Sequence, residues 1–363
     1  MSAQRIPQTA PVPTVPAELP DGWSAATPGE EDVDALVALR RQHEEAVRGW
    51  ASTTPESVSS EVSGRGAATR RHVVVRDADD LLRGWATAHD RAAARILVAV
   101  LVDSGAPPRQ ANTAAAWMLG WLRAAGEELM SGRGVTSSQL DSGVFAGDER
   151  QRAWLRTTGY THARSWWQMT RPVPVKEAYG TLPPPLPGVI IRRVRTGRDG
   201  MPAEADLRTV HDIIEAAFDD HFNAHHETFD EFISRLREDP GHRWDHWWVA
   251  ELDDDPSEGV LPVGALVATA LERHGNRPAS SYIEYLGVLT AARGRGVGTS
   301  LVHAVIADAA SRGRSHVGLE VDADSPTGAE AFYASLGFAT QYVTESWHLD
   351  IAAGTAPAGG TAT

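Results

Sequence analysis

The alternation of apolar and polar positions divides the chain into two stretches, each of which predicts strands and helices in turn. Apolar residues that recur every three or four positions indicate amphipathic helices, and short apolar runs bounded by turn residues indicate buried strands. The first stretch predicts a helix at 32–50, strands at 72–75, 83–88 and 94–102, helices at 110–129 and 148–158, and a strand at 160–169. The second predicts a strand at 189–194, helices at 203–219 and 228–237, strands at 247–252, 261–271 and 282–289, a helix at 297–310, a strand at 317–321, a helix at 329–336 and a strand from 338.

A proline-rich segment separates the two stretches. It contains Arg-Pro-Val-Pro from Arg171 and Leu-Pro-Pro-Pro-Leu-Pro from Leu182, which favour an extended, semi-rigid backbone. The chain has 363 residues, enough for two domains of roughly 150 residues each plus tails. The expected limits are a disordered tail at 1–20, an N-terminal domain at 21–172, the linker at 173–187, a C-terminal domain at 188–351 and a disordered tail at 352–363.

Composition and charge limit the binding partners and the cellular compartment that we expect. The formal net charge of -14 disfavours nucleic acid, whose protein partners present a basic face, and is compatible with a cationic amine. Since the chain has no cysteine, neither disulfides nor protein thiol chemistry are expected. No apolar run approaches the roughly 18 residues of a membrane span, and residues 1–20 lack the apolar core of a signal peptide. We therefore expect a cytoplasmic monomer or homodimer without a membrane partner.

One glycine-rich turn carries the clearest candidate chemistry. It follows the strand at 282–289, reads Arg-Gly-Arg-Gly-Val-Gly at 293–298, and opens a helix. The first turn of a helix has unpaired N–H groups and the positive end of the helix dipole, and glycines let a phosphate approach the backbone. The turn lacks the Lys-Ser/Thr of a Walker loop, and Leu301 occupies the third glycine position of a dinucleotide fingerprint. The pattern therefore indicates a phosphate site of another kind.

This turn and the region at 317–338 together resemble the GNAT acetyltransferases. Arg293, Gly296 and Gly298 match motif A of that family, (Gln/Arg)-x-x-Gly-x-(Gly/Ala), whose backbone amides hold the pyrophosphate of acetyl-CoA. The later region resembles the pattern Asn-x-x-(x)-Ala-x-x-(Leu/Phe)-Tyr-x-x-x-Gly-Phe, with Ser325 where Asn is usual. A serine hydroxyl can still cap the following helix and bond the cofactor.

The resemblance implies both a fold and a co-substrate. The fold class is α/β (α+β), as two tandem GNAT folds, each with a mixed, mostly antiparallel central sheet flanked by helices. The co-substrate is acetyl-CoA, and in the family the strand before the turn splays from its neighbour at a bulge so that pantetheine pairs with its backbone. The implied cofactor-binding residues are Leu286, Gly287, Val288, Arg293, Gly294, Arg295, Gly296, Val297, Gly298, Thr299 and Ser325.

The first stretch predicts a repeat of this fold that has lost the cofactor site. Aligning Gly159 with Gly337 places Leu155 at the position of Tyr333, which removes the hydroxyl. Pro107 and Pro108 stand where the phosphate turn would be, and proline has no N–H to offer. Tandem halves with a degenerate N-terminal copy resemble the actinobacterial tandem acetyltransferases, among them the mycothiol synthase family.

Three residues are candidates for proton transfer. Tyr333 matches the usual general acid of the family, a phenol near the sulfur of CoA, and could alternatively be a core aromatic. Glu284 and Glu320 are carboxylates in otherwise apolar strands, where burial is costly unless they face a wet pocket or a partner. Strand alternation would place Glu284 on one face with Tyr282 and Leu286. We expect water-mediated proton removal by Glu284, with Glu320 as the alternative base.

The segment at 218–227 lies between the two early helices, where GNAT proteins gather substrate residues. Asp220 and His221, with Tyr282, are the expected substrate contacts, although a solvated loop would have the same composition. Zinc sites use fixed ligand spacing, and the segment has no His-Glu-x-x-His, so no metal is expected.

These features predict an acetyl-CoA-dependent N-acetyltransferase that transfers acetyl to a primary amine of a small molecule by direct attack in a ternary complex. One alternative is a non-catalytic, acyl-CoA-binding or regulatory GNAT-like protein, and another is acetylation of a protein amine. The acceptor itself cannot be read from these residues.

Overall fold

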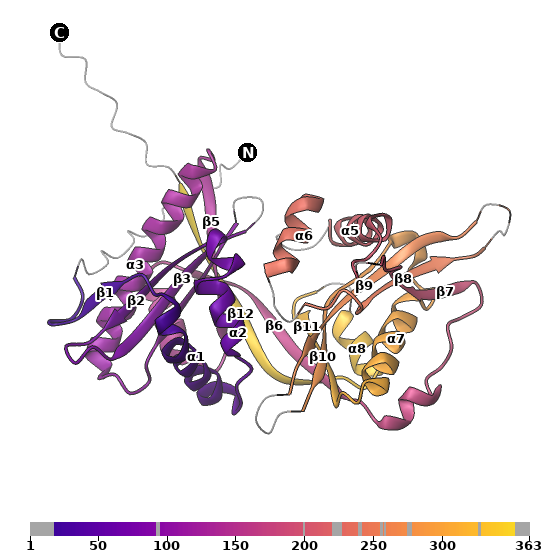
Figure 1. Cartoon of the computed structure of the whole chain (residues 1–363), viewed down its shortest axis with the longest axis horizontal. Coiled ribbons are helices and arrows are strands. Elements are labelled where there is room, and N and C mark those ends of the chain that lie inside the picture. The colour runs from indigo at the N-terminus through magenta and orange to yellow at the C-terminus, as the bar shows by residue number, and fades with distance from the viewer. Residues whose placement is uncertain are drawn as a thin grey trace, which may run out of the picture. The chain divides into compact units, whose positions relative to one another are not determined.

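The computed structural model describes residues 18–91, 95–198, 200–219, 227–238, 242–254, 257, 259–273, 278–325 and 328–352. These residues form two compact units (Figure 1). The first unit takes its described residues from Met1–Gly49, Thr69–Ala163 and Glu345–Thr363, and the second from Trp50–Ala68 and Arg164–Thr344. Residues 1–17 and 353–363 of the predicted tails lie outside the described residues.

The first unit is a sheet covered by helices. Its elements are β1 (Ser24–Ala26), α1 (Val33–Arg48), β2 (Arg70–Arg76), β3 (Leu82–Arg91), β4 (Arg95–Val102), α3 (Pro108–Gly132), β5 (Ser137–Phe145) and α4 (Glu149–Thr157). The strands follow the order β1-β2-β3-β4-β5, and β4 and β5 are parallel while the preceding pairs are antiparallel.

The core of the first unit lies between this sheet and α3. Ala115, Met118 and Leu122 recur on one face of the helix and are fully buried, as an amphipathic pattern predicts. Trp347 and Ile351, near the end of the chain, belong to the same core. Neither α3 nor any other helix in the described ranges is apolar over a long enough stretch to cross a membrane.

The second unit contains a larger set of elements around its own sheet. They are α2 (Pro55–Val62), β7 (Val189–Arg193), α5 (Glu204–Phe218), α6 (Phe229–Glu238), β8 (Trp247–Leu252), β9 (Leu261–Leu271), β10 (Ser280–Val288), α7 (Val297–Ser311), β11 (His316–Asp322) and α8 (Ala329–Ser335). The strand order is β6-β11-β10-β9-β8-β7, where β6 is Thr161–Pro172. Only β10 and β11 among the described pairs of this sheet are parallel.

Two separate apolar clusters cover the two faces of this second sheet. Leu301 and Ile306 of α7 pack on one face together with Leu319 of β11. Val210 of α5 and Phe232 of α6 pack on the other face. Figure 1 shows α5 and α6 on the side of the sheet opposite α7 and α8.

Each half of the sequence runs through the same series of elements, and the two halves exchange their last strands. β6, from the first half, pairs with β11 in the second unit, and β12 (Ala339–Ala352), from the second half, ends beside β5 in the first unit. The units are therefore not continuous in sequence, unlike the two domains that the linker predicts. The reason is packing, because Trp347 and Ile351 of β12 complete the core of the first unit.

The predicted fold class is confirmed, and most predicted elements are present within one or two residues of their expected ends. Among the described α-helices and strands, one helix and two strands were not predicted. They are β1, α2 and β5. In β5 the buried residues are Leu140, Asp141, Ser142 and Val144, and Asp141 lies within ion-pair distance of Arg95 and His348. The two buried polar residues interrupt the apolar run that would predict a strand.

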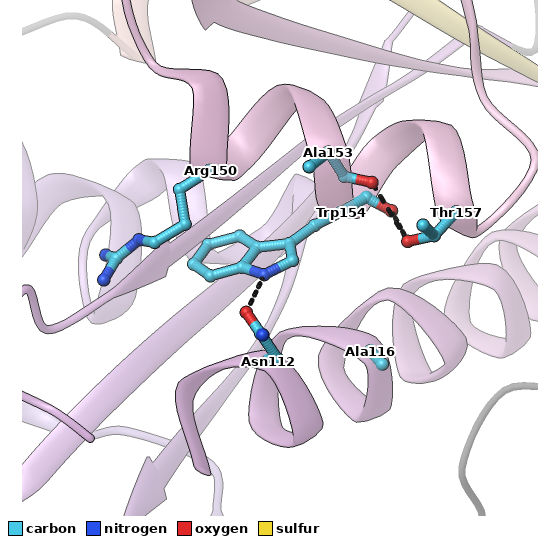
Figure 2. A pocket seen from close by; sticks show the side chains of 6 residues that line it. All are labelled: Asn112, Ala116, Arg150, Ala153, Trp154 and Thr157. Atoms are coloured by element: carbon cyan, nitrogen blue, oxygen red, sulfur yellow. Dashed lines mark hydrogen bonds between the residues drawn. The ribbon is translucent and has the colours of Figure 1, made fainter. Parts of the chain in front are cut away.

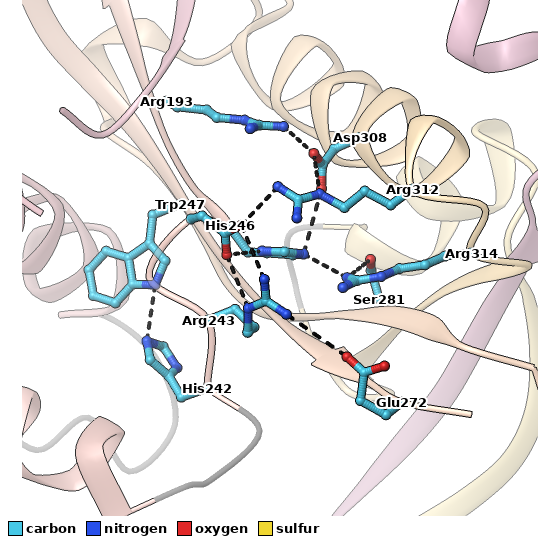
Figure 3. A network of polar contacts seen from close by, with 11 residues as sticks. Arg193, His242, Arg243, His246, Trp247, Glu272, Ser281, Asp308, Arg312 and Arg314 are labelled. Atoms are coloured by element: carbon cyan, nitrogen blue, oxygen red, sulfur yellow. Dashed lines mark hydrogen bonds and ion pairs between the residues drawn. The ribbon is translucent and has the colours of Figure 1, made fainter. Parts of the chain in front are cut away.

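A buried polar network ties α7 to the sheet of the second unit (Figure 3). His246 is fully buried, its Nδ1–H donates to Asp245 at 2.8 Å, and its Nε2 accepts from Arg314 at 2.6 Å. Arg314 also donates to Ser281 Oγ of β10 at 2.9 Å. Asp308 of α7 pairs with two further arginines. Since Nε2 must accept from a guanidinium, the imidazole is neutral here.

We predict that a fragment beginning at Pro185 aggregates. It lacks β6, so β11 would expose the unpaired edge of an apolar strand. Size-exclusion chromatography and light scattering of the purified fragment provide the measurement, and a fragment beginning at Arg164, which retains the paired part of β6, is the control. A soluble, monomeric protein from Pro185 onward would contradict this role of β6.

We also predict that stability falls as the pH falls below about 6.5. Burial, and then the charge of Arg235, lower the pKa of His242 from 6.5 to about 4, so between pH 6.5 and pH 4 the folded state binds fewer protons than the unfolded state. The loss for this group should be on the order of 2 kcal/mol and complete near pH 4. Urea unfolding at a series of pH values measures it.

His242 Nε2 accepts from Trp247 Nε1 at 3.2 Å, so His242→Gln preserves an acceptor and should flatten this part of the profile. Substitution of the exposed His316 by Gln is the control. Identical profiles for the wild type and His242→Gln would show that another group titrates.

Candidate active site

β10 separates from β11 halfway along its length. The two strands pair from Ser281 opposite Val317 to Ile283 opposite Leu319, and then stop. Beyond this point β10 continues to Val288 paired with β9, while β11 remains paired with β6. The β10 backbone after Ile283 thus has an unpaired edge toward β11, and such an edge can hydrogen-bond an extended ligand.

A β-bulge marks the point of separation. Ile283 lies opposite Ala268 and Tyr285 opposite Val267, so Glu284 is the extra residue on β10. The bulge changes the alternation of faces: Leu286 packs with the α7 cluster, and Tyr285 packs with the α5 and α6 cluster. The expectation that Leu286 shares one face with Tyr282 and Glu284 is therefore wrong, because it assumed an uninterrupted period of two.

The glycine-rich turn connects β10 to the start of α7. Gly294 and Gly296 have φ values of +79° and +75°, which only glycine adopts without strain. Gly296 is the N-cap of α7 and provides no side-chain cap, and the first helical bond runs from Ser300 N–H to Gly296 C=O at 3.0 Å. The N–H groups of the three residues between them, at 297–299, have no acceptor within the helix. The turn thus presents donors and the positive end of the helix dipole.

Three elements meet at Gly298. A Cβ on Gly298 would lie 3.4 Å from Phe332 Cζ of α8 and 3.9 Å from Val288 Cγ2 of β10. The end of β10, the first turn of α7 and the helix that carries Tyr333 are therefore neighbours. Gly287 has a different constraint, since a Cβ there would lie 3.0 Å from Ala217 Cβ of α5.

The two arginines of the turn differ in their surroundings. Arg295 donates to both carboxylate oxygens of Asp254 at 2.5 Å. Arg293 is exposed and forms no ion pair within the described residues. The expected positive charge of the turn is therefore neutralised at Arg295 and available at Arg293. Val297 is buried in the core, and Thr299 is partly exposed in the first helical turn.

Tyr333 lies on α8 with its ring among other aromatic rings. Its centroid is 4.9 Å from that of Phe332 and 5.7 Å from that of Phe338. Burial raises the pKa of the Tyr333 phenol, so the hydroxyl stays protonated at neutral pH. A protonated phenol is the form that a proton donor requires.

Gln168 of β6 organises a polar cluster beside the separation of the strands. The Tyr282 hydroxyl donates to Gln168 Oε1 at 3.2 Å, and Gln168 Nε2 donates to Glu320 and to Thr344 Oγ1 at 3.1 Å. This amide orientation follows from chemistry, because a carboxylate only accepts. Burial, and then the charge of Glu320, raises the pKa of Tyr282. Gln168 was not predicted as a site residue, because it lies in the other half of the sequence.

Glu284 lies near the positive charge of Arg235 on α6. The Arg235 guanidinium donates to both Glu227 oxygens at 2.8 and 2.7 Å and lies 5.6 Å from the centre of the Tyr285 ring. Burial opposes this charge, yet the Glu227 hydrogen bonds and the nearby Tyr285 and Glu284 raise the pKa of Arg235. The positive charge of Arg235 is thus permanent and lies in the field of Glu284.

The remaining predicted site residues have different outcomes. Ser325 does not cap α8, because α8 begins at Ala329 with Gly328 as N-cap at φ +68° and has no side-chain cap. Asp220 and His221 lie outside the described residues. Within the described ranges no group of three His, Asp or Glu side chains could bind a metal ion.

The first half closes its equivalent helix, α4, in the same way. Tyr160 N–H bonds to Leu155 C=O at 3.0 Å, as Phe338 N–H bonds to Tyr333 C=O at 3.1 Å. These bonds support the predicted alignment of Leu155 with Tyr333. Pro107 is the N-cap of α3 and Pro108 begins the helix, so the first N–H of that helix is missing.

Figure 2 shows the indole that occupies the space between α3 and α4. Trp154 Nε1 donates to Asn112 Oδ1 at 2.7 Å, and Arg150 stacks on the indole at 4.9 Å. A small pocket of 270 Å³ remains beside them. Loss of the cofactor site from this half stays a prediction.

Comparisons with known proteins support the class that this geometry indicates. Residues 208–338 match the sequence model of the acetyltransferase (GNAT) family. No curated protein sequence matches the chain.

Solved structures extend the likeness over both halves. A GCN5-related N-acetyltransferase from Sphaerobacter thermophilus is 23% identical with a TM-score of 0.68, over 94% of this chain and 99% of that chain. A tandem GNAT protein from the clavulanic acid biosynthesis pathway is 16% identical with a TM-score of 0.63, over 90% and 98%. N-myristoyltransferase of Saccharomyces cerevisiae with bound myristoyl-CoA is 10% identical with a TM-score of 0.57, over 94% and 82%.

At these identities the structures show the fold, which is a tandem GNAT fold. The family match covers residues 208–338 in the second half, and one of these structural neighbours, N-myristoyltransferase, has myristoyl-CoA bound. The likeness to mycothiol synthase stays a prediction.

Proposed function

We propose that the chain is an acetyl-CoA-dependent N-acetyltransferase that uses its second half to acetylate a primary amine of a small molecule. One observation carries the proposal. The unpaired edge of β10, the uncapped start of α7 and the helix bearing Tyr333 meet at Gly298. An extended thiol cofactor with a diphosphate needs backbone pairing for its chain and N–H donors for its phosphates, and these elements supply both.

The residues take distinct roles in this proposal. The N–H groups at the start of α7 hold the diphosphate, and Arg293 adds a charge that no carboxylate neutralises among the described residues. The edge of β10 around Leu286 and Val288 pairs with the pantetheine chain. Ser325, although not a helix cap, remains a proposed cofactor contact.

Acyl transfer forms a C–N bond and breaks a C–S bond, so the amine must lose a proton and the thiolate must gain one. Tyr333 donates to the leaving thiolate, since it lies on the helix that meets Gly298 and its phenol is protonated at neutral pH. Glu284 receives the amine proton through water, because it is the bulged residue where the strands part. Glu320, already an acceptor of Gln168, is the alternative base, and Asp220, His221 and Tyr282 are proposed acceptor contacts.

The direct test is turnover of acetyl-CoA with a panel of small amines, read as release of free CoA thiol. Because the protein has no cysteine, thiol reagents report CoA without background from the chain. Binding of acetyl-CoA without turnover on any amine, protein N-termini included, would favour the non-catalytic acyl-CoA-binding function.

We predict one acetyl-CoA site per chain, sensitive to the turn. Gly298→Ala should weaken binding, because the added Cβ would block the approach of the diphosphate to the backbone. The fold itself has room for this Cβ, whose nearest neighbour, Phe332 Cζ, would be 3.4 Å away. Arg293→Ala should weaken binding roughly threefold to tenfold, as expected for a charge-assisted contact at an exposed site. Arg295→Ala is the matched control with a smaller effect, because Asp254 already pairs with it. Calorimetry measures all three, and two equivalent sites would refute the single-site prediction.

We predict that Tyr333→Phe retains acetyl-CoA affinity and loses turnover by about 10²- to 10⁴-fold, the usual contribution of a general acid. Tyr160→Phe is the matched control. It removes a hydroxyl that has no hydrogen bond in the described chain, at the position equivalent to Phe338. Steady-state kinetics separate the two, and a loss well under tenfold for Tyr333→Phe would reduce its role to packing.

We predict that Glu284→Gln lowers activity chiefly at low pH, where the amine most needs help in losing its proton. Glu320→Gln should lower activity less, without this pH dependence. The kcat/KM profile against pH measures both variants. The opposite pattern would assign the base to Glu320.

A further inference from the structure

The segment at 171–188, which we term the strap, lies along α7 and is part of the second unit. Val173 N–H bonds to Ser315 C=O at 2.8 Å, just beyond the C-terminal end of α7. Ala178 and Leu182 pack on the core that contains α7. Gly188 C=O accepts from Asp253 N–H at 2.9 Å, next to the Asp254 that binds Arg295. The sequence predicted a semi-rigid spacer, whereas these contacts dock it along its length.

At one end the strap contacts the helix that bears Tyr333. Arg171 Nε donates to Leu336 C=O at 2.7 Å, and its two terminal nitrogens donate to Glu177 at 2.8 and 2.6 Å. Leu336 is the C-cap of α8, so its carbonyl has no acceptor role within the helix. The pair is mostly buried, with side chains 15% and 8% exposed. A buried fork of this kind fixes a guanidinium in one orientation.

At its other end the strap contacts the phosphate turn. A Cβ on Gly296 would lie 2.8 Å from Leu186 Cδ1 and 3.1 Å from Leu186 Cγ. The Leu186 side chain therefore packs against the Cα of Gly296, the N-cap of α7. Its side chain contributes little to the core, because Leu186 is 54% exposed.

We propose that the strap is a positioning element of the cofactor site, in which Leu186 sets the Gly296 turn and Arg171 sets the helix that carries Tyr333. The inference rests on the proposed acetyl-CoA function and adds two residues to it. Each acts through another residue, since neither has a place among the groups that would react. A misplacement of about 1 Å can lower a rate by about 10²-fold, so positioning of this kind is measurable.

The two ends should give opposite kinetic signatures. Arg171→Ala should lower kcat by about tenfold or more with acetyl-CoA affinity unchanged within about twofold, because only the orientation of α8 is lost. Leu186→Ala should weaken acetyl-CoA affinity by about threefold to tenfold with a smaller change in kcat, because the turn becomes freer. Arg171→Lys should recover part of the activity, since an ammonium can reach Leu336 C=O but cannot form the fork. Tyr179→Ser, at a strap residue that is 79% exposed, is the control.

A second readout does not depend on activity. Hydrogen exchange of the protein without ligand should be faster in the amides at 336–338 of Arg171→Ala, and unchanged in the C-terminal half of α7. Glu177→Gln, which preserves the size of the side chain and weakens the fork, should show the same pattern more weakly if Arg171→Ala folds poorly.

The outcomes separate this inference from the proposed function. A wild-type protein that neither binds nor turns over acetyl-CoA would refute the function. The positioning role of the strap would be refuted if the wild type is active and both Arg171→Ala and Leu186→Ala match Tyr179→Ser in acetyl-CoA affinity, kcat and hydrogen exchange. Equal losses of acetyl-CoA affinity and of kcat in both Arg171→Ala and Leu186→Ala, with lowered melting temperatures, would show general destabilisation. This result would also overturn the positioning role of the strap.

Discussion

The separation of β10 from β11 at Glu284 is the constraint on which the candidate site depends. Strand pairing satisfies backbone groups on both edges, so an interior strand with a free edge needs a partner of another kind. The bulge produces this edge without breaking the sheet, because β9 remains paired with β10 and β6 with β11. Because of the bulge, Tyr285 packs with α5 and α6 while Leu286 packs with α7, so these neighbouring side chains lie on opposite faces of the sheet.

The strand exchange makes the second unit depend on the first half of the sequence. Gln168 and Arg171 both precede the predicted C-terminal domain, yet Gln168 contacts Tyr282 and Glu320, and Arg171 contacts the end of α8. α2 also lies in this unit, where Ser60 donates to Glu238 C=O at 2.9 Å. A first half without its own cofactor would thus still be retained, because it completes the sheet and orients side chains of the other half.

The sequence was informative where a signal is local. The strand at 247–252, the strand at 261–271 and the start of α7 at Val297 were predicted to the residue, because apolar runs and a glycine turn mark them. α2 had a weaker local signal, Thr54 followed by Pro55 and Ser57, which forms a capping box. The resemblance implied a bulge in this strand, but its position at Glu284, the Gln168 cluster and the Arg295–Asp254 pair could not be predicted, because each depends on register or on residues far apart in sequence. The wrong face for Leu286 follows from that missing register.

The glycines of the candidate site are present for different physical reasons, which the sequence motif alone does not distinguish. Gly296 needs its positive φ and also leaves room for Leu186, so its substitution would disturb the fold as well as any ligand. Gly287 is required by the close approach of α5, whatever binds to β10. Gly298 has neither constraint, since its φ is not left-handed and the nearest side-chain atom is at 3.4 Å. Packing therefore does not explain glycine at 298, whereas the proposed approach of acetyl-CoA to the start of α7 would.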